Sequence, residues 1–518
     1  MKKIKTIMSV LCVIALLTSC GTKPAQNLGA NEKKSFTYWC AIAPSLSAGY
    51  KSLNELPEYQ ELEKRTGIHM DFIHPNSNVN EQFKLLLATG EYPDIIEYSW
   101  GDYPGGPEKA IEDKVIISLN KQLAKNAPNF KKLMDENDDY RRGSITDNGT
   151  YFGFPNLATS EYRSFGGLII RKDWLDELGL DVPTTISDWE NVLRAFKEKK
   201  GATSPFTGNT WTVESLSAFT GAFGIGRHAY AENGKVKYGP MEPQFKEWLR
   251  MMNKWYSDGL LDKDYTTNTD NIIDAKIITG NAGAFAGYIG GHLGKYIAMT
   301  RETEPKFDLV GVLPPISDSV TKNYLPVVSP KVSNPFLAIT VDCADPETAM
   351  KWADYLYTDE GRLLINFGVE GVSYNMVNGY PTYVDDILHN PDGLSINEAM
   401  DKYFRVSTVS PGLKSAAEYL DQYYQLDQQK DAFKNWSTYA KDCWDSGLYS
   451  LTPTIEESEE KAAIETEIKT YTSEMILKFI QGTESFDNYD NFIATMKKLR
   501  ADRYVELLQS SYDRYLKR

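Results

Sequence analysis

The sequence predicts an α/β protein of two lobes with a helix-rich C-terminal part, and three observations support this prediction. Short apolar segments at 36–41, 68–73 and 93–98 alternate with helical patterns, an order typical of βαβ units and a mainly parallel sheet. A second succession of strand and helix begins near residue 156. From residue 397 onward the apolar spacing is helical almost throughout.

The first three strands indicate where a binding site belongs. Ile68, Met70 and Phe72 alternate with polar residues, which is typical of a half-buried strand. Ligands of parallel sheets bind beyond the carboxyl ends of the strands. Trp39 and Trp100 stand at two of these ends, so we expect both near a site.

The second lobe opens with an apolar strand at 165–170, which leads into a helix that ends at Gly179. Ser187 and Glu190 have the spacing of a capping box and predict the start of the next helix.

A pair of short helices is predicted before residue 370. Asp345 and Thr358 are the expected N-caps, and Gly368 suits the end of the second helix. Glu370 and Tyr374 follow on a glycine-flanked turn. An acid and an aromatic ring in that setting suit ligand contacts, and a plain surface turn is the simpler interpretation of the same pattern.

The longest helix is predicted near the C-terminus. Thr454 and Glu457 form a capping box, and Gly482 is its expected end. Apolar residues such as Ile464 and Phe479 fall on one face of this helix.

The N-terminus predicts a lipoprotein signal peptide. Three lysines precede an apolar run at 7–17, which is too short to span a bilayer as a helix. The run leads into Leu-Thr-Ser-Cys, which matches the lipobox of bacterial lipoproteins, so Cys20 is the expected lipidation site. We expect residues 1–19 to be removed and residues 20–34 to form a flexible tether. The protein would then be held on the cell membrane by acyl chains such as palmitate, facing the extracellular side or the periplasm.

The composition narrows the possible partners. The formal net charge is −15, and loss of the three signal-peptide lysines makes it more negative. Such a surface argues against binding of nucleic acid or anionic lipid headgroups. The 32 Tyr, 21 Phe and 10 Trp suit a large core and also stacking on sugars. Cys40, Cys343 and Cys443 allow at most one disulfide, whose existence the sequence leaves open.

Motifs of catalysis are missing from the sequence. The five histidines form no HExxH pattern, and there is no GxSxG motif. The glycines of 290–296 and 221–226 lack the spacing of a phosphate loop or a dinucleotide loop. We therefore expect a protein without enzymatic activity, cofactor or metal.

Six segments together resemble the extracellular solute-binding proteins of ABC importers. The similarity is to carbohydrate-type family 1, in the large lipoprotein group related to alginate-oligosaccharide-binding proteins. The matching segments are KRTGIHMDF (64–72), YPDIIEYSW (92–100), LIIRKDWLDELGLDVPTT (168–185), WADYLYTDEGRLLINFGVEGVSY (352–374), YTSEMILKFIQG (471–482) and SYDRYLKR (511–518).

The resemblance implies a two-lobed periplasmic-binding-protein-like fold of type II. Residues 36–155 with 328–375 would form the N-terminal lobe, and residues 156–327 with 376–518 the C-terminal lobe. An oligosaccharide would bind in the cleft, the lobes would close about a hinge, and the monomeric protein would deliver the sugar to a membrane permease. The expected ligand contacts are Trp39, Trp100, Tyr151, Arg163, Trp211, Tyr288, Glu370 and Tyr374.

One segment departs from the family pattern. Close relatives often carry a calcium loop after the helix that ends near Lys200. Here residues 196–210 read FKEKKGATSPFTGNT and contain no acid after Glu198, so we expect no calcium at this place.

Three alternative functions remain at the level of sequence. A surface glycan-binding lipoprotein of the helical-repeat type, not coupled to a permease, would have an almost entirely helical N-terminal half. A lipid-anchored glycoside hydrolase would need a pair of facing carboxylates. A peptide- or signal-sensing binding protein would share the fold.

Overall fold

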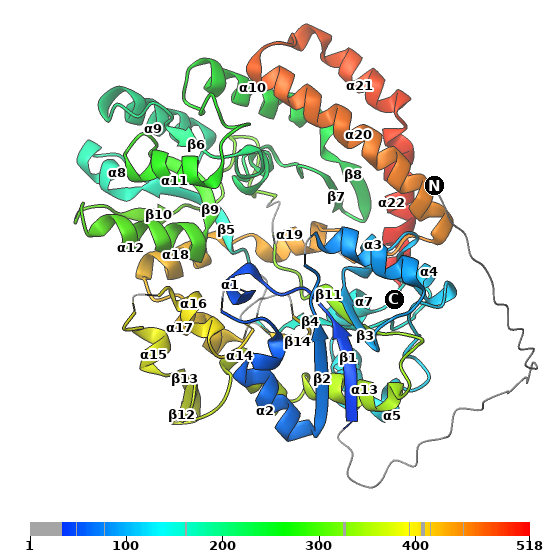
Figure 1. Ribbon diagram of the computed structural model, residues 1–518. Coiled ribbons are helices and arrows are strands. Elements are labelled where there is room, and N and C mark those ends of the chain that lie inside the picture. Colours follow the sequence, from blue (N-terminus) through cyan, green and yellow to red (C-terminus); the bar gives the residue numbers. More distant parts are fainter. Residues whose placement is uncertain are drawn as a thin grey trace, which may run out of the picture.

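The computed structural model describes residues 34–47, 49–76, 78–160, 163–324, 328–392, 394–405, 410–414, 416–448 and 450–518 (Figure 1). The expected signal peptide, Cys20 and the tether up to residue 33 lie outside the described residues. The chain forms two lobes, each built around its own sheet, which confirms the predicted α/β architecture. Among the described helices, none is long and apolar enough to cross a membrane.

The first lobe contains a six-stranded sheet in the order β14-β4-β11-β3-β1-β2. Strand β1 runs parallel to both β2 and β3, which confirms the predicted βαβ units, whereas β11 is antiparallel to β3 and β4. The strands are β1 (Lys34–Trp39), β2 (Ile68–Ile73), β3 (Ile95–Tyr98), β4 (Phe154–Ala158), β11 (Val332–Ile339) and β14 (Gly412–Lys414).

The helices that cover this sheet come from two separate parts of the chain. All four residues of β3 are buried, because helices cover both faces of the sheet centre. The helices of this lobe are α1 (Pro44–Ser47), α2 (Pro57–Thr66), α3 (Val79–Thr89), α4 (Gly106–Glu112), α5 (Leu123–Asn126), α6 (Pro128–Glu136), α7 (Asp138–Ser144), α13 (Pro346–Tyr355) and α14 (Asp359–Phe367), with the 3-10 turns η1 (Leu53–Glu55) and η2 (Trp100–Asp102).

Strand β14 joins the first sheet although the sequence assigns residues 376–518 to the second lobe. It pairs in parallel with β4. The buried ammonium of Lys414 donates to the carbonyl oxygens of Ile365 (2.6 Å) and Arg405 (2.9 Å), which ties the strand to the first lobe. The chain therefore returns to the first sheet once more than the sequence pattern indicates.

The second lobe contains a four-stranded sheet in the order β10-β5-β9-β6. Strand β5 is antiparallel to both neighbours, and all six of its residues are buried. A separate hairpin, β7–β8, lies on the side of this lobe that faces α22. The elements are β5 (Gly166–Arg171), β6 (Phe206–Thr207), β7 (Ala229–Glu232), β8 (Lys235–Tyr238), β9 (Ala284–Tyr288), β10 (Leu309–Gly311), α8 (Lys172–Leu178), α9 (Ile186–Lys199), α10 (Pro243–Ser257), α11 (Asp270–Ile278), α12 (Lys295–Arg301), the π-helices η3 (Thr212–Leu216) and η6 (Ile289–Gly294), and the 3-10 turns η4 (Gly221–Phe223) and η5 (Gly239–Met241).

The C-terminal part is mainly helical, as predicted. Its longest helix, α20, packs against α10 of the second lobe and also touches α4 of the first lobe. The elements are β12 (Tyr374–Val377), β13 (Tyr380–Tyr383), α15 (Asp385–Leu388), α16 (Ile396–Asp401), α17 (Ala417–Tyr423), α18 (Asp427–Trp436), α19 (Ala440–Ser446), α20 (Ile455–Gln481), η7 (Phe486–Asn488), α21 (Tyr489–Lys498) and α22 (Ala501–Tyr515).

Most predicted helix caps are confirmed. Asp345, Thr358 and Thr454 each accept a backbone N–H at the start of a helix, and Gly482 ends α20 in the left-handed conformation. The three cysteines Cys40, Cys343 and Cys443 are free thiols and buried.

The capping box predicted at Ser187 and Glu190 is wrong by two residues. Thr185 and Asp188 form the box instead. Thr185 also makes a parallel bridge with Ile316, and this contact holds the residue in extended backbone just before the helix begins. A tertiary contact thus selects one of two equally plausible caps.

Candidate functional site

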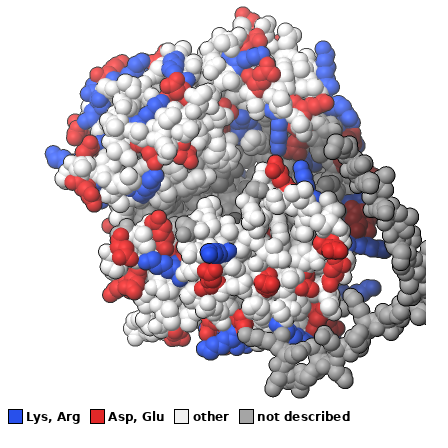
Figure 2. All heavy atoms as spheres, in the orientation of Figure 1, with Lys and Arg blue, Asp and Glu red and all other residues white. Residues whose placement is uncertain are grey.

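A cavity of about 610 Å³ lies between the two lobes. Its wall on the first lobe includes Gly101 and Phe152, and its wall on the second lobe includes His228, Tyr238 and Lys461. The surface is visibly hollowed between the upper and lower halves of the molecule in Figure 2. Small-molecule sites commonly have volumes of about 300–1,000 Å³ and lie between domains, so this cavity is large enough for a sugar ligand.

Helix α20 contributes a charged wall to the cavity. Lys461 and Lys469 each lie 2.7 Å from the carboxylate of Glu465, and the hydroxyl of Tyr504 donates to the same carboxylate at 3.1 Å. Burial raises the pKa of Glu465, but the hydrogen bonds and charges of the two lysines outweigh it and lower this pKa to about 2. The wall therefore carries one more positive than negative charge at neutral pH.

His228 reaches the cavity from the start of the β7–β8 hairpin. Its side chain is exposed toward the cavity, and the protein packed on its other sides removes part of its hydration. This burial, together with the neighbouring charge of Arg227, lowers the pKa of His228 to about 4. At neutral pH the imidazole is uncharged and offers one hydrogen-bond donor and one acceptor.

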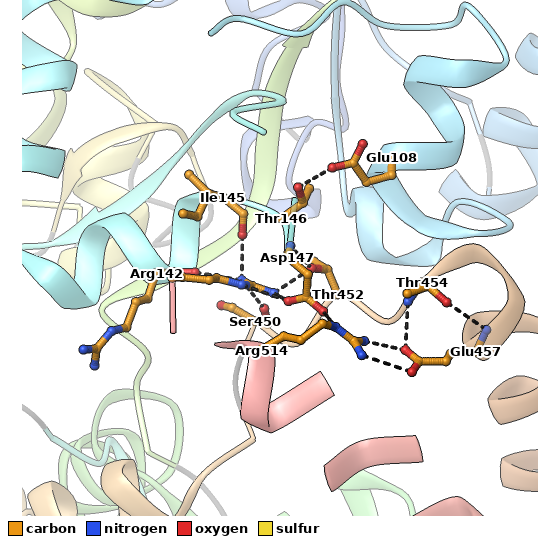
Figure 3. A network of polar contacts seen from close by, with 11 residues as sticks. Glu108, Arg142, Ile145, Thr146, Asp147, Ser450, Thr452, Thr454, Glu457 and Arg514 are labelled. Carbon is orange, nitrogen blue, oxygen red and sulfur yellow. Dashed lines mark hydrogen bonds and ion pairs between the residues drawn. The ribbon is translucent and has the colours of Figure 1, made fainter. Parts of the chain in front are cut away.

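Four charged residues join the lobes at one side of the cavity, and we call them the Asp147 junction: Asp147, Glu457, Arg514 and Arg518. Asp147 belongs to the loop after α7 of the first lobe, Arg514 lies in the last turn of α22 (Figure 3), and Arg518 lies three residues beyond that helix. The guanidinium Nε of Arg514 lies 2.5 Å from Asp147 Oδ2, and that of Arg518 lies 3.0 Å from Oδ1. Arg514 also pairs with Glu457 at the start of α20.

Arg518 makes further hydrogen bonds within the junction. Its Nη1 donates to the carbonyl oxygens of Arg142 (2.8 Å), Ile145 (2.6 Å) and Ser450 (3.0 Å). Its side chain is only 1% exposed. Because Ile145 and Ser450 also line the cavity, the junction fixes part of the cavity wall.

Two exposed aromatic residues of the second lobe form what we call the aromatic shelf: Trp211 and Tyr288. Their exposed fractions are 47% and 39%. The indole Nε1 of Trp211 donates to the hydroxyl of Tyr288 at 3.3 Å, so the two rings hold each other although 77 residues separate them. Large exposed rings with a polar tip suit stacking against a ligand.

The shelf lies at the end of β5 where the chain enters the second lobe, and neither Trp211 nor Tyr288 is among the residues that line the 610 Å³ cavity. Strand β5 begins at Gly166, directly after the chain has crossed from β4, so this end of β5 is the end nearest the first sheet. Tyr288 pairs with Gly166 in the antiparallel register. The π-helix η3, which follows Trp211, packs on β5 and β9.

Each shelf residue immediately precedes a π-helix. Trp211 precedes η3, and Tyr288 precedes η6. π-Helical turns are rare and often mark functional sites. Reciprocal hydrogen bonds between Asn209 and Thr212 fix the turn that carries Trp211.

The absence of a side chain at Gly166 leaves room for the ring of Tyr288. A Cβ atom at Gly166 would lie 3.1 Å and 3.2 Å from two ring carbons of Tyr288 and 2.7 Å from Cδ1 of Leu216. The ring therefore rests against bare backbone, and only glycine leaves room for it.

Comparison with known proteins identifies the family. Residues 43–363 match the family model for bacterial extracellular solute-binding proteins. The chain belongs to this family.

Relatives of this solute-binding protein align over most of their length. The fructooligosaccharide ABC transporter substrate-binding protein FusA of Streptococcus pneumoniae is 25% identical, over 99% of this chain and 98% of that protein. Lipoprotein LipO of Bacillus subtilis is 24% identical, over 76% of this chain and 78% of LipO.

Solved structures support the fold. Alginate-binding protein AlgQ2 without calcium has a TM-score of 0.73 at 22% identity and covers 93% of this chain and 98% of its own. FusA with kestose has a TM-score of 0.72 at 22% identity, covering 93% and 99%. These likenesses agree with the predicted two-lobed fold.

Of the eight predicted ligand contacts, the structure brings two exposed aromatic rings together, those of Trp211 and Tyr288, and it also places Glu370 next to the buried Tyr374. Trp39 is 5% exposed and packs against Phe83. Trp100 is fully buried, and its indole donates to the carbonyl of Phe336 at 3.1 Å. Neither ring presents a face to solvent, because both complete the core of the first lobe.

The other four predicted contacts are spread over the molecule. Tyr151 is half-buried against Phe130. Arg163 is buried, with its guanidinium 4.7 Å from the ring centre of Phe165. Tyr374 is 3% exposed and packs in the core beneath the β12–β13 hairpin, and Glu370 is exposed beside it.

The sequence analysis missed the cavity wall on α20 and the Asp147 junction. Lys461, Glu465 and Lys469 are four residues apart, and this spacing places them on one helix face. Nothing in the sequence says that this face meets the first lobe. Within the described part of the chain, no three His, Cys, Asp or Glu side chains gather as ligands for a metal ion.

Proposed function

We propose that this solute-binding protein is the substrate-binding lipoprotein of an ABC importer, which captures an oligosaccharide between its lobes and delivers it to a membrane permease. The aromatic shelf carries this proposal, because two exposed rings held together by a hydrogen bond suit the apolar C–H faces of sugars. The polar cavity wall supplies hydrogen-bond partners for hydroxyl groups. FusA, named for fructooligosaccharides, supports the substrate class.

A glycoside hydrolase fits the cavity less well. Such enzymes need two carboxylates about 5–9 Å apart across the scissile bond. Among the described residues that line the cavity, Glu465 is the only carboxylate, and two lysines and Tyr504 already bind it. Incubation with oligosaccharides followed by product chromatography tests this point, and released products would contradict the transport function.

The decisive experiment is a thermal-shift screen with kestose, oligogalacturonides, milk-type oligosaccharides and a control set of peptides. A ligand at a hundred times its Kd stabilises the native state by about 2.7 kcal/mol, so binding raises the unfolding temperature. We expect at least one oligosaccharide to do so. A shift with peptides alone would replace the oligosaccharide by a peptide ligand.

Replacement of Trp211 tests whether the shelf is the binding site. We expect Trp211→Ala to weaken binding more than tenfold, since aromatic anchors contribute about 2 kcal/mol or more. Met299→Ala is the matched control, because Met299 is an exposed apolar residue of the same lobe and is not part of the shelf. Equal affinities of parent and Trp211→Ala would remove the shelf from the site.

Anchoring by Cys20 is a separate part of the proposal. We expect Cys20→Ala to move the protein from the membrane fraction to the soluble fraction, because the thiol is the only point of acyl attachment in the proposal. Membrane fractionation of cells measures this, and full retention of the variant would exclude a lipid anchor at Cys20.

A further inference from the structure

His292 contacts the aromatic shelf from its own π-helix. The main-chain N–H of Tyr288 donates to Nδ1 of His292 at 3.2 Å, and the two ring centres are 5.7 Å apart. This hydrogen bond closes the turn in which β9 ends and η6 begins. The position of Tyr288 therefore depends directly on the imidazole.

The hydrogen bond from the N–H of Tyr288 determines which nitrogen of His292 carries the proton. A main-chain N–H can only donate, so Nδ1 must accept, and the proton of the neutral ring is on Nε2. A protonated imidazole carries hydrogen on both nitrogens and cannot accept this bond. The N–H of Tyr288 would then face another N–H.

The packing around His292 leaves its ring little freedom. A Cβ atom at Gly287 would lie 2.9 Å from both Cβ and Cγ of His292, so the side chain lies directly against the strand backbone. The ring of Tyr296 packs edge-on, with ring centres 5.9 Å apart. The imidazole thus cannot move aside when it gains a proton without disturbing Tyr288.

The charges around His292 come from two helices. Asp270 and Asp274 lie on α11, and Lys295 lies on α12, where it pairs with Asp274 at 2.6 Å. Burial is the largest influence on His292 and lowers its pKa, with Lys295 acting in the same direction and the two aspartates opposing. From helix α18, the uncharged amide of Gln429 donates to the carbonyl of Ile289 at the start of the same π-helix.

We propose that His292 is a positioning residue of the sugar site, which sets the orientation of Tyr288 and holds the shelf in binding geometry only while Nδ1 is unprotonated. The inference rests on the proposed function for its meaning in transport, but its structural part does not require a ligand. Because burial lowers the pKa of His292 below the usual histidine value of about 6.5, the shelf loosens and sugar binding weakens only when the pH falls well below that value.

Two variants separate the hydrogen bond from titration. In His292→Asn the amide oxygen takes the place of Nδ1 as acceptor and does not titrate. In His292→Leu a side chain of similar bulk has no acceptor. Circular dichroism and the unfolding temperature at pH 7.5 establish that both variants fold.

Trp211 reports on the shelf without any ligand. Its emission is obtained as the difference between each protein and the same protein with Trp211→Phe, measured from pH 7.5 to pH 5. We expect this difference to change with pH in the parent and to stay constant in His292→Asn. A constant signal in the parent, or the same titration in His292→Asn, would overturn the inference.

Kestose binding, measured by calorimetry at pH 7.5 and pH 5.5, tests the consequence. Loss of one hydrogen bond of ordinary strength corresponds to about a fivefold change. We expect the parent to bind more weakly at pH 5.5, by up to about fivefold, His292→Asn to bind equally at both values, and His292→Leu to bind weakly at both. Equal binding by all three proteins contradicts the positioning role. If kestose does not bind the parent, the fluorescence titration still decides the inference, and the proposed substrate alone fails.

Discussion

The Asp147 junction connects the two lobes, whereas the aromatic shelf is an exposed surface of the second lobe, and the two are built in opposite ways. In the junction, Arg518 is 1% exposed and its guanidinium contacts one carboxylate, three carbonyl oxygens and the hydroxyl of Thr452. In the shelf, the two rings stay exposed and share one hydrogen bond of 3.3 Å.

The difference indicates that the junction holds the two lobes together, whereas the shelf is suited to binding a ligand. Buried charges are costly to leave without partners, so the junction fixes the first lobe against α22. Exposed rings are retained at a cost in solvation, which a ligand recovers when it covers them. The comparison predicts that changes in the junction alter stability, whereas changes in the shelf alter affinity.

Loss of Asp147 is the most severe way to break the junction. In Asp147→Ala, the buried guanidinium of Arg518 has no counter-charge, and breaking such a pair costs about 3–5 kcal/mol. We expect a clear fall in the urea midpoint of unfolding. Asp135→Ala is the matched control, because Asp135 is 56% exposed and pairs with Lys131 on its own helix. Equal midpoints for the two variants would show that the junction does not hold the lobes.

A methyl group at Gly166 tests whether the position of the Tyr288 ring matters for binding. In Gly166→Ala the new Cβ would overlap Leu216 and press on the ring of Tyr288, and such overpacking costs about 1–3 kcal/mol. We expect weaker oligosaccharide binding with a smaller loss of stability than in Asp147→Ala. Gly291→Ala is the control, since nothing lies within 4 Å of the position that its Cβ would take. Unchanged affinity in Gly166→Ala would mean that the ring position does not matter.

The smallest effect is expected from the hydroxyl of Tyr288. Tyr288→Phe removes the acceptor for the indole of Trp211 but keeps the ring, and a long exposed hydrogen bond contributes about 0.5 kcal/mol. Calorimetry should show affinity within about twofold to threefold of the parent. A tenfold loss would instead indicate that the hydroxyl itself contacts the sugar.

Local sequence patterns predicted local structure well and failed where distant contacts intervene. The caps at Asp345, Thr358 and Thr454 were predictable, because a capping side chain bonds to a backbone N–H only a few residues away. The start of α9 was not, because the bridge between Thr185 and Ile316 selects one cap over another.

In the candidate site too, local patterns predicted which residues could bind a ligand but not how they contact one another. Trp211 and Tyr288 were named from residue type and position, but nothing local to either indicates their contact across 77 residues. Trp100 has the same residue type as Trp211 at an equally suitable strand end, and its indole is buried instead, because β11 passes over it and accepts its N–H.

Local sequence patterns were enough to predict the strand–helix alternation, most helix ends and the resemblance that led to the family. These features depend on residues within one or two turns, and on short motifs that survive in order along the chain. Tertiary contacts settled which aromatic rings stay exposed, that Gly412–Lys414 returns to the first sheet, and that Asp147 meets Arg518. Burial and long-range pairing arise from the packing of whole elements, which no local pattern encodes.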